Sequence, residues 1–291
     1  MIIIERTQNV RLGILLTMSS LVLFTIGEVL VKFLIREHDV TQVVWARYTF
    51  HALVTAVFLF RTGIGGHART ERLGLHLGRS ALMLLATTAF FLALRYLPLA
   101  DAVAINFVAP ILVTAFAIPI LKEHVGRRRW IAIIVGFCGV LIIIRPGLGV
   151  MHWATALPLC TAAGYALYQV LTRFAARTEN TNTSLFWTSV FGVVVSSCAV
   201  PFFWTQPSPT AWIMMIALGG VYGFGHYLLI RGLEIAPTSM LSPFFYTQII
   251  WATLFGFIFF GHFPDAPTLV GLAVVMASGL YIWRRETMLK G

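Results

Sequence analysis

The stretch Leu94-Arg95-Tyr96-Leu97-Pro98-Leu99-Ala100-Asp101-Ala102 has a second version later in the chain, Ile230-Arg231-Gly232-Leu233-Glu234-Ile235-Ala236-Pro237-Thr238. Each version lies between two long apolar segments, and the two are offset by 136 residues. The likeness is weak residue by residue, but the same order of features continues on both sides. Internal repetition on this scale is typical of secondary transporters, which bind their solute between the repeats.

The repeat extends well beyond these two stretches. In each copy the next apolar segment holds an early proline, Pro110 or Pro243, and a short polar break and a short final apolar segment follow. The final segments end in Gly-Val-Leu-Ile at 139–142 and in Gly-Leu-Tyr-Ile at 279–282, so the offset has drifted only to 140 residues. We therefore predict two units, 1–146 and 147–291, that together form one transport domain.

Composition narrows the class of protein. The 291 residues are 58% hydrophobic and only 11% charged, and the mean hydropathy is +0.85. A soluble domain carries roughly 25% charged residues, so this is a membrane protein with almost no soluble part. The net charge of +10 comes from basic residues in short loops between apolar spans. That distribution follows the positive-inside rule and argues against a nucleic-acid partner.

The apolar segments predict an all-α polytopic membrane protein, since a bilayer core needs about 20 apolar residues per helix. Five spans in each copy is an odd number, so the two copies must face opposite ways, as inverted repeats. The ten predicted spans lie at about 11–34, 42–60, 76–96, 100–121, 129–145, 152–173, 184–204, 210–231, 237–260 and 267–284.

Loop charges predict the orientation, with the N- and C-termini cytoplasmic. The outer side keeps three basic residues, Arg36, Arg95 and Arg145, against sixteen on the inner side. The sixteen are Arg6, Arg11, Arg61, Arg69, Arg72, Arg79, Lys122, Arg127, Arg128, Arg129, Arg173, Arg177, Arg231, Arg284, Arg285 and Lys290.

Glu28, Lys32 and Arg47 are charged residues within the first two spans, where charge is costly and suggests function. Glu28 and Lys32 are four residues apart on the first span and can pair. Glu28 and Arg47 both lie about 9 Å below the outer boundary at 1.5 Å per residue, so an ion pair between them is reasonable. Such a pair is either an outer gate or carboxylate clamp, or a structural pair with Lys32 extending to the surface.

Two histidines lie in spans. His51 is one helical turn below Arg47, and His226 is in the middle of the eighth span. Either could relay protons, because histidine titrates near neutral pH, or each could stay neutral with one hydrogen bond.

Polar and aromatic residues in mid-span need partners and should face inward, where they would line an amphipathic cavity. The alternative is that several of them join helices or lie in the interfacial belt. The cavity candidates are Asn106, Tyr165, Gln169, Tyr222, His226, Tyr246 and Trp251. Pro110 and Pro243 are hinge candidates. Cys138, Cys160 and Cys198 have no metal-ligand spacing and are expected to be small core residues.

Signals of an enzyme are absent. The chain has no zinc-protease, nucleophile-elbow or P-loop motif, so neither a catalytic residue nor a cofactor or metal is expected. Any active transport must therefore draw on a gradient.

Ten spans in two sets of five, together with Val44-Trp45-Ala46-Arg47-Tyr48 at the start of the second span, resemble the drug/metabolite transporter superfamily, EamA type. The resemblance covers essentially the whole chain. It implies a pseudo-two-fold bundle around a central cavity, with the short fifth and tenth helices at the periphery. It also implies functional relatives among amino-acid exporters of the YddG kind. Other relatives import metabolites such as S-adenosylmethionine or exchange nucleotide sugars.

The leading hypothesis is a secondary transporter that exports amino acids or related small metabolites across the bacterial inner membrane by alternating access. Its partners would be a small-molecule substrate and membrane lipid, and the sequence does not specify an oligomeric state. The alternatives are an importer of another metabolite, S-adenosylmethionine or nucleoside-like, and a membrane sensor or scaffold that does not transport. A channel is a further alternative, but the chain lacks the ring of like charges that channels use.

Overall fold

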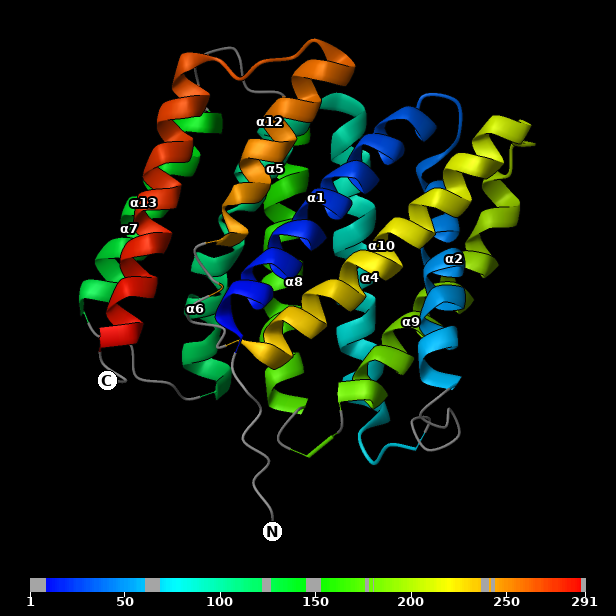
Figure 1. The fold of residues 1–291 in the computed structure, drawn as a ribbon, viewed down its shortest axis with the longest axis horizontal. Coiled ribbons are helices and arrows are strands. Elements are labelled where there is room, and N and C mark those ends of the chain that lie inside the picture. The colour runs from blue at the N-terminus through cyan, green and yellow to red at the C-terminus, as the bar shows by residue number, and fades with distance from the viewer. Residues whose placement is uncertain are drawn as a thin grey trace.

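The structure, a computed structural model, describes residues 9–60, 69–121, 127–144, 153–175, 178–179, 181–236, 241 and 244–288. These residues form helices and no strand (Figure 1). The first half contributes α1 (Val10–Leu34), α2 (Val40–Phe60), α4 (Leu73–Tyr96), α5 (Leu99–Asn106), α6 (Ala109–Leu121) and α7 (Arg127–Ile144). The second half contributes η1 (Trp153–Thr155), α8 (Ala156–Ala175), α9 (Thr181–Ala199), η2 (Val200–Phe203), α10 (Pro209–Ile235), α12 (Thr247–Phe260) and α13 (Ala266–Met288).

Two of the predicted spans differ from the structure. The fourth was expected as one helix over 100–121, but it is interrupted at Phe107 and Val108 between α5 and α6. Pro110 explains the interruption, because its ring would clash with the carbonyl of residue 106, and α5 ends at that residue. The ninth was expected as one helix over 237–260; Leu241, Phe244 and Phe245 are helical, a turn lies at Tyr246, and α12 runs from Thr247. The hinge candidate Pro243 and residues 237–240 lie outside the described residues.

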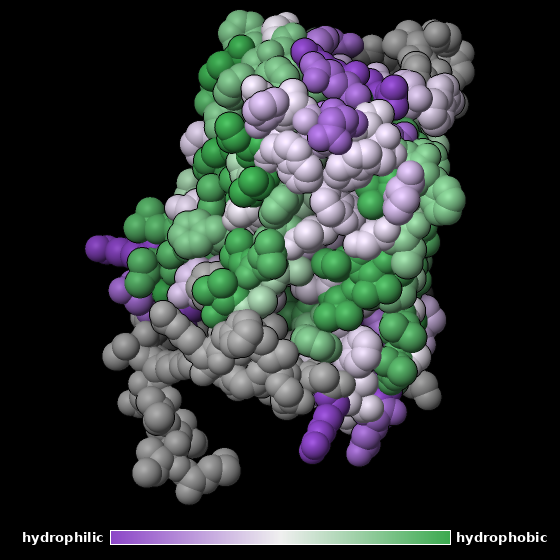
Figure 2. Space-filling view, turned by 90° about the vertical axis from the view of Figure 1, so that its right-hand side faces the viewer, coloured by the Kyte–Doolittle hydropathy of each residue, from purple (hydrophilic) through white to green (hydrophobic). Residues whose placement is uncertain are grey.

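Five described helical segments are long and apolar enough to cross a membrane. They are Val10–Leu34, Leu73–Tyr96, Leu99–Ile120, Thr183–Phe203 and Pro209–Leu233, and three shorter apolar stretches lie in α7, α12 and α13. In Figure 2, hydrophobic side chains cover much of the side of the bundle, and hydrophilic ones lie mainly toward the top and the bottom of the view.

Lipid on the outside of the bundle also explains one wrong expectation. Cys138, Cys160 and Cys198, expected in the core, are all exposed. A lipid-facing surface is as apolar as a core, so a small apolar residue type does not by itself indicate burial in a membrane protein.

The two halves of the chain interleave. α10, from the second half, packs against α1 and α2, while α4, from the first half, packs against α8 and α9. α12 lies against α1 and α5, and α6 lies against α8. We call α1, α2, α10 and α12 the first body, and α4, α5, α6, α8 and α9 the second body. The helices α7 and α13 pack against each other beside them (Figure 1).

Glycines on α10 permit close packing within the first body. A Cβ at Gly219 would lie 2.2 Å from the Cβ of Phe50, and one at Gly223 would lie 2.8 Å from the Cβ of Val54. Both neighbours are on α2, so α10 and α2 approach too closely for a side chain at either glycine.

We call the end of the bundle where α1 ends and α10 begins the upper end, and the opposite end the lower end, as in Figure 1. α1 begins and α13 ends at the lower end (Figure 1). α8 descends from the upper end, opposite to α1.

Candidate functional site

The Arg47 guanidinium lies between two aromatic rings in the first body. Its Cζ is 4.7 Å from the ring centroid of Tyr48 and 4.7 Å from that of Tyr222 on α10, and Arg47 is 5% exposed. Cation–π contacts of this kind hold a desolvated guanidinium without a carboxylate partner. The Tyr222 ring has room only because residue 27 is glycine, since a Cβ there would lie 2.6 Å from Tyr222 Cε2.

Glu28 on α1 is 5% exposed, and its partner comes from α12. Gln248 Nε2 donates a hydrogen bond of 3.0 Å to Glu28 Oε1, while Oε2 is buried without a hydrogen-bond partner. The Glu28 carboxylate and the Arg47 guanidinium therefore face different neighbours, Gln248 for the first and the Tyr48 and Tyr222 rings for the second.

The predicted ion pair between Glu28 and Arg47 is not formed, although both residues lie in the described part of the chain. Their depths were compatible with a pair, but the rings of Tyr48 and Tyr222 hold the guanidinium, and Gln248 holds the carboxylate. Each charge thus keeps hydrogen-bonding capacity for a further group.

The two predicted histidines meet beside this cluster. The ring centroids of His51 and His226 are 5.1 Å apart, and Phe24 lies 4.8 Å from His226 and 5.8 Å from Tyr222. His226 Nδ1 donates to the Tyr222 carbonyl oxygen at 2.8 Å. His51 Nδ1 is buried without a partner. A proton relay through this pair remains a prediction.

The remaining cavity candidates lie on the helices around the cluster. Tyr246 stacks on Phe107 at 5.3 Å, where the chain is interrupted between α5 and α6. Asn106 Oδ1 and Trp251 Nε1 are buried without hydrogen-bond partners. Trp251 is three residues from Gln248, so it lies one turn from the Glu28 partner.

Tyr165 and Gln169 lie on α8 in the second body. Tyr165 stacks on Tyr168 of the same helix at 6.1 Å. Gln169, one turn closer to the lower end, is exposed rather than enclosed. Ala162, Ala166 and Val170 on the same helix are buried, at 0%, 0% and 2% exposed, so Gln169 lies on a different face of α8 from these residues.

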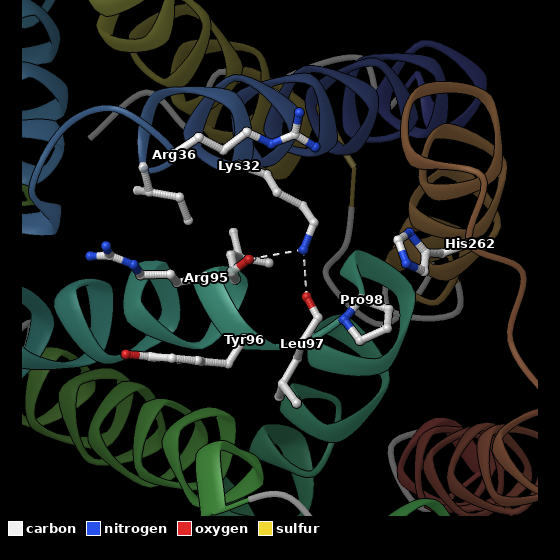
Figure 3. A pocket seen from close by; sticks show the side chains of 9 residues that line it. Lys32, Arg36, Arg95, Tyr96, Leu97, Pro98 and His262 are labelled. Atoms are coloured by element: carbon white, nitrogen blue, oxygen red, sulfur yellow. Dashed lines mark hydrogen bonds between the residues drawn. The ribbon is translucent and has the colours of Figure 1, made fainter.

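Lys32 has partners that side-chain pairing did not predict (Figure 3). Its Nζ donates to the backbone carbonyl oxygens of Leu94 at 2.9 Å and Leu97 at 2.6 Å, at the end of α4. It neither pairs with Glu28 nor extends freely to the surface. The last carbonyls of a helix lack intrahelical partners and attract a cation, so Lys32 joins the first body to the second at the upper end.

Arg79 was counted among the loop charges, but it lies inside α4 and is 1% exposed. Its Nε donates to Thr172 Oγ1 at 3.0 Å, Nη1 to the Ser184 carbonyl at 2.9 Å, and Nη2 to the Tyr168 hydroxyl at 3.0 Å. These bonds tie α4 to α8 and α9 within the second body. The sequence signal that could have found it was a basic residue three positions inside an apolar span.

A bundle whose two halves interleave around buried charged and aromatic groups is the architecture of a secondary transporter. Comparison with known proteins agrees. The model of the EamA-like transporter family matches residues 11–145 and 152–284, and the chain belongs to this family. As the resemblance implied, the family is one of transporters, not of enzymes.

Curated relatives match over most of their length. The chain is 23% identical to an S-adenosylmethionine uptake transporter of Rickettsia prowazekii, over 93% of this chain and 92% of the relative. It is 25% identical to a riboflavin transporter of Vibrio cholerae, over 85% and 84%. Together with the apolar helices, these bacterial relatives indicate a multi-pass protein of the bacterial inner membrane.

A solved crystal structure shares the fold. It aligns with a TM-score of 0.66 at 15% identity and covers 94% of this chain and 98% of the other.

Proposed function

We propose that this protein is a carrier that moves a small zwitterionic metabolite by alternating access. The observation that carries the proposal is the buried cluster of Arg47, Tyr48, Tyr222 and Glu28, whose two opposite charges are not paired with each other. A guanidinium can bind a carboxylate through two hydrogen bonds, and the free Glu28 Oε2 can accept one from an ammonium. Aromatic rings beside both charges suit a solute that also carries a flat ring.

The contact pattern supports two bodies that move against each other. Exchanging the halves of the chain turns the pair α1–α10 into α8–α4, and the pair α2–α10 into α9–α4, and all four pairs pack closely. This correspondence is what two inverted five-helix repeats would produce. We propose that each moving body contains helices of both repeats.

We further propose that the structure is closed at the upper end and open toward the lower end. Lys32 links α1 to α4 at the upper end, whereas Gln169, on the corresponding α8, is exposed. The lower end carries the basic residues that predict a cytoplasmic side. The proposed state is therefore accessible from the cytoplasm.

For the substrate, we propose a metabolite with an α-amino-acid group, and S-adenosylmethionine is the first to test. It combines a carboxylate, an ammonium and a ring system, and it is the solute named for one of the relatives. An amino acid with an aromatic side chain shares the first two groups. Riboflavin, named for another relative, offers the ring alone. Export was the sequence-based expectation, and uptake is what the name of the first relative supports.

The test is counterflow in proteoliposomes loaded with each of these three solutes in turn. We expect saturable exchange of S-adenosylmethionine, strongly reduced in Arg47→Gln and in Glu28→Gln. The control is Arg11→Gln, an exposed arginine at the start of α1. Flux in vesicles of known orientation then decides between export and uptake. Absence of exchange for all three solutes by folded protein would refute the proposed substrate class.

A further inference from the structure

A cavity of about 600 Å³ lies at the upper end, between the ends of α1, α4 and α12 and the start of α5 (Figure 3). It is separate from the cluster around Arg47 and shares no residue with it. Four of the residues that line it are basic or can become so: Lys32, Arg36, Arg95 and His262. No aspartate or glutamate is among the described residues that line it.

Lys32 and Arg36 concentrate positive charge on one side of this cavity. Lys32 lies in the last turn of α1 and Arg36 lies two residues beyond its end, and both are near the Phe260 ring, at 5.5 Å for Lys32 Nζ and 5.4 Å for Arg36 Cζ. Like charges gathered at one ring repel each other. Arg36 Cζ is also 5.2 Å from the centroid of the Phe33 ring. Arg36 is exposed, so its N–H groups can reach a hydrogen-bond acceptor.

The two arginines have no acidic partner in the described part of the chain. No carboxylate lies within 4 Å of Arg36 or Arg95 there, and both residues are exposed. In Figure 3, Arg36 lies beside Lys32, Arg95 extends along the rim from α4, and His262 faces them from beyond α12. The described lining therefore gathers basic side chains without an acidic one, and Asp101 on α5, outside the lining, is the acidic residue that acts electrostatically on Lys32.

We propose that this cavity binds an anionic group, a carboxylate or a phosphate, with Arg36 as its main ligand and Lys32, Arg95 and His262 around it. Binding would relieve the repulsion between Lys32 and Arg36, and the guanidinium edge offers two parallel hydrogen bonds to such a group. The group belongs either to a soluble anion at the upper side or to a lipid headgroup. This proposal rests on the proposed function in one respect: in a carrier, the site would be the first contact for the carboxylate of a solute.

The first experiment is equilibrium dialysis of ³²P-orthophosphate and ¹⁴C-citrate against the full-length protein in maltoside detergent. We expect saturable binding that Arg36→Gln weakens by about tenfold or more, as loss of hydrogen bonds to a charged group would give. Arg11→Gln removes the same charge from the other end of α1 and should leave binding within about twofold. Added salt should weaken binding, because Arg36 and the bound anion are near water, where salt screens their attraction.

The second arm separates the two sources of the anion. The protein is reconstituted in phosphatidylcholine nanodiscs doped with phosphatidylglycerol, and the lipid retained after extraction is measured. One outcome is that the protein retains phosphatidylglycerol, that Arg36→Gln and Arg95→Gln abolish this retention, and that neither orthophosphate nor citrate binds. This outcome supports the site with a lipid headgroup as its ligand. Binding of either soluble anion supports it with a soluble ligand.

Two results would overturn the proposal: no retention of any of the three probes, or equal retention by Arg36→Gln and Arg11→Gln. His262→Gln is a second, milder variant should Arg36→Gln fail to fold, and it should weaken binding of whichever probe is retained. Solute exchange in proteoliposomes is a separate measurement. Its failure would refute the carrier and leave the anion site standing, and the reverse also holds.

Discussion

Replacing Lys32 with methionine should open the upper end of the protein. The variant keeps an unbranched apolar side chain of similar length and loses the ammonium that donates to the Leu94 and Leu97 carbonyls at 2.9 Å and 2.6 Å. Those bonds join α1 to α4, so they stabilise only the state in which the two bodies meet at this end. A ligand or bond that favours one state shifts the population by its differential free energy alone.

The size of the shift follows from the two bonds. Hydrogen bonds that involve a charged group contribute about 1.5–3 kcal/mol each, so the lower value gives about 3 kcal/mol for the pair. At 1.4 kcal/mol per tenfold, the ratio of closed to open molecules falls by about 100-fold. A closed state favoured about 100 to 1 would then be about as populated as the open one.

The shift can be measured as a distance between the two bodies by pulsed electron paramagnetic resonance. Spin labels at Glu37, just beyond α1, and at Trp153, in η1, occupy exposed positions at the upper end. Because Cys138, Cys160 and Cys198 are exposed, they are first replaced with serine. We expect one short distance in the parent protein and a second, longer one in Lys32→Met. Lys32→Arg, which keeps the charge, should restore the short distance.

An unchanged distance distribution in folded, doubly labelled Lys32→Met would refute this reasoning. It would mean that other contacts between the two bodies, such as the hydrogen bond from Trp45 Nε1 on α2 to Ser197 Oγ on α9, close the upper end without Lys32.

The remaining predictions concern the cluster and the second body. Tyr222→Ala should reduce solute flux strongly, because it removes one of the two rings against Arg47, and Trp251→Ala should reduce it too; normal flux in both folded variants would place the solute elsewhere. Gly27→Val should abolish flux and lower the melting temperature, because a Cβ at position 27 would lie 2.6 Å from Tyr222 Cε2. Gly220→Ala is the control, because a Cβ at position 220 meets nothing within 4 Å. Arg79→Met should destabilise the protein by about 1–3 kcal/mol, because it leaves the partners of a buried arginine unbonded, and a melting curve like that of Arg11→Gln would contradict the role given to it.

Whether a feature of the fold or of the site could be predicted from the sequence depends on whether it involves residues that are close together in the chain. Apolar length located the helices, and Pro110 marked the interruption between α5 and α6, because the clash that stops a helix involves residues four positions apart. The depths of Glu28 and Arg47 were also computed from local geometry. The partners of Glu28 and Arg47 could not be predicted in this way. The rotation of each helix and the position of the Tyr222 ring depend on packing against α10 and α12.

Lys32 and Arg79 escaped prediction for a related reason. Lys32 bonds backbone carbonyls, which every residue has, so no sequence pattern singles out Leu94 and Leu97 as its partners. Arg79 is close to the start of a span, where a basic residue ordinarily faces the cytoplasm. Its burial requires three acceptors that converge from α8 and α9, which are about a hundred residues away in the chain.

Replacing Arg79 and replacing Lys32 should have different effects, because the hydrogen bonds of the two residues join different pairs of helices. All the acceptors of Arg79 belong to the second body, so its bonds persist whether the upper end is open or closed. Lys32 bonds across the boundary between the bodies and must release α4 whenever the upper end opens. Arg79→Met should therefore lower the melting temperature without changing the distance between the labels, and Lys32→Met should change the distance with a smaller loss of stability. If both variants changed both quantities alike, α4 would not move with α8 and α9, and the two bodies would have to be divided differently.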